Sequence, residues 1–288
     1  DALPRLRQGG GTPKRRTPVL VKGTHPHYHP PKVRSLRVVR PRWKTRRARF
    51  SECDDRNEDL ILFMAKRDER FGRPTKIAWE LFRKANSYHP DFVAVTGDMV
   101  DVPTQACLET AGNLLQSLEA PFFFCVGNHE WGNRVTPPDR AHWRNELRAW
   151  TPQPMDWFVQ RWQGVNLLFV DDSDYQITPE QLKRTSELLE TGRPCLLFMH
   201  IPIVIESLIE PTRAKWKSPI LIGAAHGEGV QPSTAAFCEL VKKSPQVKAI
   251  FTGHIHFDHV DEYRENVHQY VTAPAFESVL RRVRVEPA

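Results

Sequence analysis

The chain has 288 residues, of which 40% are hydrophobic and 26% are charged, which is ordinary for a soluble globular protein with a sizeable core. No run approaches the ~20 apolar residues that a membrane-spanning helix needs. No apolar signal-peptide region follows Asp1, which favours a cytoplasmic location if no signal peptide was removed.

The basic charge of the chain is concentrated at its beginning. Residues 1–50 contain 15 lysines and arginines against one acid, so they carry +14, whereas the remainder has 26 against 33 acids and carries −7. Residues 1–33 also hold Gly-Gly-Gly at 9–11 and scattered prolines, which predicts a basic, flexible arm ahead of one domain over 34–288. Such an arm can bind nucleic-acid phosphates, although basic tails are commonly only solvated.

After residue 34, strand-like and helix-like segments alternate. Short strands are expected at 34–39 and 48–51, and residues 76–88 have the periodicity of an amphipathic helix. Alternation of buried strands with helices predicts an α/β architecture, in which ligands collect at the carboxyl ends of strands. The further strand-like runs are 92–96, 121–126, 165–170, 195–199, 247–252, 267–272 and 281–285, and the helical segments lie near 104–118, 139–150, 179–190 and 232–243.

Four of these runs end in a residue that can bind a metal. A single histidine after a strand is unremarkable, but four such ends are hard to explain by core packing, because buried polar groups need partners. Carboxylate, amide and imidazole groups suit divalent first-row metals. The four ends are Gly97-Asp98, Gly127-Asn128-His129-Glu130, His200 and Gly253-His254-Ile255-His256.

The order and spacing of these motifs resemble the signature of the calcineurin-like metallophosphoesterases over roughly residues 48–288. The resemblance implies two packed β-sheets flanked by helices, a four-layer α/β sandwich. It also implies an enzyme that hydrolyses phosphomonoesters or phosphodiesters, with a metal-activated water at a centre of two divalent ions. Manganese, iron and zinc are the expected metals, and a small-molecule phosphoester is the expected substrate.

The resemblance also implies a role for each motif residue. Asp98 would bridge the two ions, and one ion would be bound by Asn128, His200 and His254. His256 would bind the other ion. His129 would contact the phosphate, where it stabilises developing charge or helps to protonate the leaving group.

The first motif of the family, Asp-x-His after the first strand, is not intact. In the favoured alignment the strand is 48–51, Asp54 takes the place of the aspartate as a metal ligand, and Arg56 replaces the histidine. Arginine stays protonated and has no lone pair for a metal. This departure leaves open a non-catalytic binding module with an impaired first metal site, and the basic arm leaves open a nuclease of the same fold.

In the other alignment the strand is 19–21, Gly23-Thr24-His25 follows it, and the aspartate is lost. In the favoured alignment Arg56 deprives one metal of a ligand, which leaves three outcomes open. That metal binds weakly, His25, His27 or His29 of the arm takes the place of the ligand, or Arg56 contacts the phosphate directly as a fixed cation.

Two further groups receive structural interpretations. The aspartates at 171, 172 and 174 are expected to serve a turn and a helix cap, and Asp258 and His259 a solvated loop. The five cysteines form no Cys-x-x-Cys pair, which favours buried free thiols.

Overall fold

The computed structural model describes residues 19–21 as a strand and then residues 66–285, apart from 68, 133–138, 152 and 225–228. The predicted strands at 34–39 and 48–51 lie outside the described residues, as do Asp54, Arg56 and His25.

The smaller of two sheets contains the first strand of the chain. Its order is β10-β1-β2-β3, with β1 at Val19–Val21, β2 at Val93–Thr96, β3 at Phe122–Cys125 and β10 at Leu280–Arg282. β1 runs parallel to β2 and antiparallel to β10. The residues of β1 therefore belong to a sheet although they lie within the expected arm. The domain boundary at residue 34 stays a prediction.

The larger sheet has the order β4-β5-β6-β7-β9-β8. Its inner strands are parallel, and β4 and β8 close its two edges in antiparallel pairing. The two edge strands were not predicted, because their sequences mix polar and apolar residues, and His259 begins β8 instead of lying in a loop. The strands are Trp157–Trp162 (β4), Val165–Val170 (β5), Cys195–Phe198 (β6), Val247–Thr252 (β7), His259–Arg264 (β8) and Val267–Val271 (β9).

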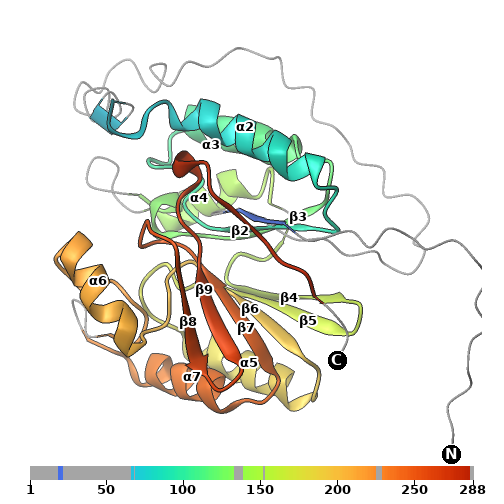
Figure 1. The fold of residues 1–288 in the computed structure, drawn as a ribbon, viewed down its shortest axis with the longest axis vertical. Coiled ribbons are helices and arrows are strands. Elements are labelled where there is room, and N and C mark those ends of the chain that lie inside the picture. Colours follow the sequence, from blue (N-terminus) through green and yellow to red (C-terminus); the bar gives the residue numbers. More distant parts are fainter. Residues whose placement is uncertain are drawn as a thin grey trace, which may run out of the picture.

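Helices cover the outer face of each sheet, as Figure 1 shows. The small sheet packs against α2 (Pro74–Ser87), α3 (Gln105–Gln116) and α4 (Arg140–Leu147), and the large sheet packs against α5 (Pro179–Glu190) and α7 (Pro232–Lys243). These five helices were predicted, whereas α6 (Glu206–Trp216) was not. No helix within the described ranges is long and apolar enough to cross a membrane.

The inner faces of the two sheets bury a common apolar layer. Phe123 and Cys125 of β3 meet Phe169 of β5 and Phe198 of β6 there. On the large sheet, neighbouring rings stack with centroids 4.5–5.2 Å apart from Phe158 through Phe169, Phe198 and Phe251 to Tyr270. The order helices, sheet, sheet, helices confirms the predicted four-layer sandwich. Within the described chain Cys107, Cys125 and Cys195 are buried free thiols, as expected, and Cys238 is half-buried.

Candidate metal centre

The candidate ligands lie at the carboxyl ends of strands from both sheets. Asp98 follows β2 and Asn128 follows β3 in the small sheet, while His200 follows β6 and His254 and His256 follow β7 in the large sheet. The sandwich therefore brings together residues that are far apart in the sequence.

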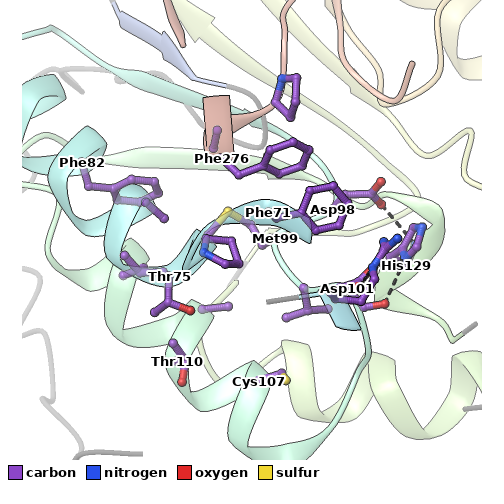
Figure 2. A pocket seen from close by; sticks show the side chains of 18 of the residues that line it. Phe71, Thr75, Phe82, Asp98, Met99, Asp101, Cys107, Thr110, His129 and Phe276 are labelled. Carbon is purple, nitrogen blue, oxygen red and sulfur yellow. Dashed lines mark hydrogen bonds and ion pairs between the residues drawn. The ribbon is translucent and has the colours of Figure 1, made fainter. Parts of the chain in front are cut away.

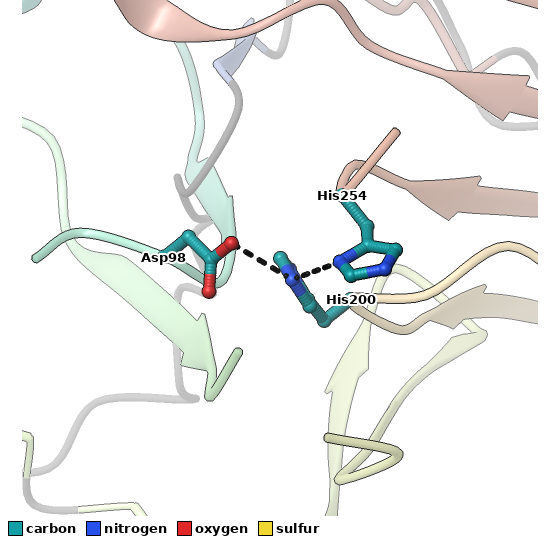
Figure 3. Close-up of side chains that lie close together, drawn as sticks. All are labelled: Asp98, His200 and His254. Atoms are coloured by element: carbon teal, nitrogen blue, oxygen red, sulfur yellow. Dashed lines mark hydrogen bonds and ion pairs between the residues drawn. The ribbon is translucent and has the colours of Figure 1, made fainter. Parts of the chain in front are cut away.

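His200 is at the centre of this group and is fully buried. Its Nε2 atom lies 3.1 Å from Asp98 Oδ2, 3.2 Å from Asn128 Oδ1 and 3.1 Å from His254 Nδ1. Figure 3 shows Asp98 and His254 converging on its ring from opposite sides. The other ring nitrogen, Nδ1, lies 2.6 Å from the Thr96 carbonyl oxygen and donates to it, which leaves the lone pair on Nε2.

These donor atoms fit one metal ion. Those of Asp98, His200 and His254 all lie within 4.8 Å of one another, and Asn128 adds an amide oxygen. Four tetrahedral ligands at the usual metal distances are about 3.3 Å apart. Tyr175 supports this geometry because its hydroxyl lies 2.9 Å from Nε2 of His254, which leaves Nδ1 of that ring for the metal.

The backbone around the cluster is held in unusual conformations. Asp98, His254 and His256 have φ angles of 56°, 64° and 60°, in the left-handed region that non-glycine residues rarely adopt. Gly97 has φ 86°, and a Cβ atom there would lie 2.5 Å from His200 Nδ1 and 2.7 Å from Gly127 N. The close approach of the two sheets at this point therefore requires glycine.

Glu130 ties the two loops of the small sheet together. Its fully buried carboxylate accepts hydrogen bonds from the backbone N–H groups of Gly127 and Asp98 at one oxygen and of Met99 and Val100 at the other. Burial and the nearby Asp98 carboxylate raise the pKa of Glu130 to about 7. The four N–H groups favour the ionised form of Glu130, because each oxygen already accepts two hydrogen bonds and has no further lone pair for a proton.

His129 is part of a chain of polar contacts that the sequence did not reveal. Its Nδ1 lies 2.9 Å from the Asp101 carbonyl oxygen and 3.3 Å from the Asp101 carboxylate, which Arg67 binds with two nitrogens. Burial lowers the pKa of His129, but the Asp98 charge and the Asp101 hydrogen bond outweigh it and raise the pKa to about 9. The one available signal for Asp101 was an acid three residues after Asp98.

The aspartates after β5 support the site instead of capping a helix. Asp172 is fully buried and accepts hydrogen bonds from the backbone N–H groups of His200 and Ile201 at 3.0 and 2.9 Å. Burial raises its pKa to about 8. Asp171 makes the expected turn by accepting from Ser173 N, but α5 is capped by Thr178, so the capping expectation was wrong.

His256 is held apart from the cluster around His200. Its ring packs edge-on against Trp216 and Phe276, with centroids 5.0 and 5.4 Å away. Trp216 Nε1 donates to the Ile255 carbonyl oxygen at 2.8 Å, and Lys215 donates to the His256 carbonyl oxygen. The end of α6 therefore fixes the loop that carries His254 and His256.

A four-layer sandwich with this donor set at its strand ends is the framework of a metal-dependent enzyme. The profile of the calcineurin-like phosphoesterases matches residues 73–258. Because the match spans more than half of the chain, the protein belongs to the calcineurin-like phosphoesterase family, whose members hydrolyse phosphoesters with divalent metal ions. The comparison with curated proteins gave no significant match.

Solved structures of similar fold have low sequence identity. One is a dimetal phosphatase from Danio rerio, with 11% identity and a TM-score of 0.49, covering 70% of this chain and 78% of that one. Another is a phosphopantetheinyl hydrolase from Mycobacterium tuberculosis, with 15% identity and a TM-score of 0.41, covering 68% and 86%. At these values the similarities carry no argument about the substrate.

Proposed function

We propose that this protein hydrolyses phosphate monoesters or diesters of small molecules at a centre of two divalent ions. The observation that carries the proposal is the convergence of Asp98, Asn128 and His254 on the Nε2 atom of His200 within 3.2 Å. Carboxylate, amide and imidazole donors in this arrangement suit manganese, iron or zinc.

Each side chain of the proposed centre has a separate task. Asn128, His200 and His254 would hold one ion, and Asp98 would be shared with the second, since its two oxygens face different neighbours. Oδ2 faces His200, while Oδ1 accepts from His129 N at 3.1 Å. When bound, the ions lower the pKa of a water molecule and neutralise charge on the phosphoryl group.

His129 is the proposed catalytic side chain. Its Nδ1 contacts the carbonyl oxygen of Asp101 at 2.9 Å, which orients the imidazole, and the Asp101 carboxylate 3.3 Å away favours its protonated form. A protonated imidazole beside Asp98 can donate a hydrogen bond to a phosphoryl oxygen or a proton to the departing oxygen.

The second ion would be held by Asp98, His256 and a ligand from the altered first motif. β1 pairs in parallel with β2, so the strand beside Asp98 is 19–21, which supports the alignment in which Gly23-Thr24-His25 follows it. We therefore favour His25 over Asp54 as the further ligand, and this assignment is independent of the cluster around His200.

Manganese-dependent hydrolysis of bis-p-nitrophenyl phosphate and p-nitrophenyl phosphate tests the proposal, with bound metal measured in parallel. Asp98→Asn should lose activity and bound metal together. His129→Ala should keep its metal and lose roughly 10²–10⁴-fold in kcat. Asp156→Asn, an exposed aspartate with a 3.5 Å contact to Arg184, is the control and should behave as wild type.

Folded wild-type protein that turns over neither substrate with manganese, iron or zinc would contradict the proposal. That result would favour the binding module, which the altered first motif allows. Preference for one of the two substrates would distinguish diesterase from monoesterase activity.

A further inference from the structure

A cavity of about 140 Å³ lies beside the proposed metal centre, between α2, α3 and the short helix η3 (Ala275–Glu277). It opens onto Asp98, His129 and His256, so a phosphoester bound at the centre would have this space next to it. Its lining is otherwise largely apolar.

The polar and apolar parts of the lining are separated in space. Figure 2 shows Asp98, Asp101 and His129 at one end of the cavity and Phe82 and Thr75 at the other. Arg67 belongs to the charged end because it binds the Asp101 carboxylate. Apolar side chains that also line the space include Pro74, Ala78, Met99, Ala111 and Leu114.

Aromatic rings connect the cavity to the proposed centre. Phe71 and Phe276 lie with their centroids 4.4 Å apart, and the Phe276 ring packs against the ring of His256. The guanidinium of Arg67 lies 4.7 Å from the centre of the Phe71 ring while it binds Asp101. Arg67 therefore links the Phe71 wall of the cavity to Asp101, which contacts His129.

We propose that this cavity holds the organic group of the substrate, and that this group is an uncharged six-membered ring or an alkyl group of similar volume. This inference rests on the proposed function and names the substrate class for the same site. A wholly apolar cavity of about 150 Å³ in another protein holds benzene, and the 140 Å³ here includes the charged end, so the space suits no more than one such ring. The apolar side chains of Phe71 and Phe276 and the adaptable thioether of Met99 suit an apolar partner of this size.

The same lining disfavours a charged or strongly hydrated group. Such a group would lose water at the inner end, where Phe82 offers no hydrogen bond and the buried hydroxyl of Thr75 offers a single one, fewer than a charged or strongly hydrated group needs. The phosphate itself stays at the charged end. A second fused ring exceeds the volume and should gain nothing.

Binding of phosphonates to the full-length, manganese-loaded protein tests the inference by calorimetry. Benzylphosphonate has a methylene in place of the ester oxygen of a phenyl phosphate, so it is not hydrolysed, and methylphosphonate lacks the ring. Burial of the ring should make benzylphosphonate bind roughly 10- to 100-fold more tightly than methylphosphonate. Naphthylmethylphosphonate should bind no more tightly than benzylphosphonate.

Two variants locate the effect in this cavity. Ala78→Leu adds bulk on α2 that faces the space and should reduce the ratio of the two affinities to about 3 or less. Ala236→Leu makes the same change at an exposed position of α7 and should leave the ratio as in wild type. If Ala78→Leu does not unfold cooperatively, Phe71→Ala removes one wall and should also lower the ratio.

Equal affinities for the two phosphonates in wild type would overturn the inference, and so would an unchanged ratio in a folded Ala78→Leu or Phe71→Ala variant. Failure of the proposed function has a different signature, which is the lack of manganese-dependent hydrolysis with either nitrophenyl substrate. If the protein hydrolyses the nitrophenyl substrates but binds both phosphonates equally, the proposed function stands and the proposed role of the cavity is wrong.

Discussion

Glu130→Gln should destabilise the protein far more than its small chemical change suggests. The carboxylate accepts four backbone hydrogen bonds, two at each oxygen, and it is fully buried. Glutamine keeps one acceptor oxygen and turns an NH₂ group toward the other two N–H donors. Whichever way the amide is oriented, two buried donors lose their acceptor.

The magnitude follows from that count. A buried donor without an acceptor costs about 1–3 kcal/mol, so two of them give about 2–4 kcal/mol when the long 3.4 Å contact from Val100 is weighted less. For a chain of this size, that loss lowers Tm by roughly 3–7 °C. Because Glu130 holds the backbone of Asp98, metal affinity should also fall, by roughly 10- to 100-fold.

Urea denaturation followed by tryptophan fluorescence measures the loss, with a chelator present so that bound metal does not add to the stability of the folded state. Glu187→Gln makes the same change at an exposed position of α5 and should stay within about 0.5 kcal/mol of wild type. A Glu130→Gln variant as stable as wild type would refute the reasoning, because it would mean that Glu130 is neutral in the folded protein.

Two other changes test the packing around the centre. Gly97→Ala should abolish metal binding and destabilise the fold more than Gly164→Ala, as measured by bound metal and urea denaturation. Both glycines have φ 86°, but a Cβ atom meets other atoms only at Gly97, so equal losses would contradict the steric argument. Trp216→Phe keeps the ring beside His256 but removes the N–H that binds the Ile255 carbonyl, so it should cost about 1 kcal/mol and lower kcat several-fold. Hydrolysis assays check this, and an unchanged kcat would show that the ring alone positions His256.

The inner elements of the fold were predictable because most of their residues are buried. β2 and β6 are short buried runs, and only Asn166 in β5 and Lys248 in β7 interrupt otherwise apolar stretches, as is typical of strands covered on both faces. The edge strands β4 and β8 include exposed polar residues, Arg161 and Glu262, and mixed sequences of this kind are hard to distinguish from loops. Helix α6 contains Pro211, a residue that argues against a helix interior.

The site was predictable where a residue follows an apolar strand and not where it reaches the site from another element. Asp98 and His200 come directly after apolar runs, and the structure brings them together as the motif order suggested. Tyr175 and Arg67 act through contacts with residues 79 and 34 positions away, and no local pattern marks such pairs. Strand β1, which pairs with β2, received less weight in the sequence analysis, because a three-residue strand in a proline-rich segment is a weak signal.

The centre draws Asp98 and Asn128 from one sheet and His200 and His254 from the other. Its affinity for an ion therefore measures how well the two sheets are aligned, since ligands must be held to within about 0.5 Å. The alignment is set by the aromatic layer between the sheets, where Phe123 and Phe169 lie with centroids 5.7 Å apart. A substitution in that layer can change metal affinity without touching a ligand, so sequence variation deep in the sandwich can tune catalysis.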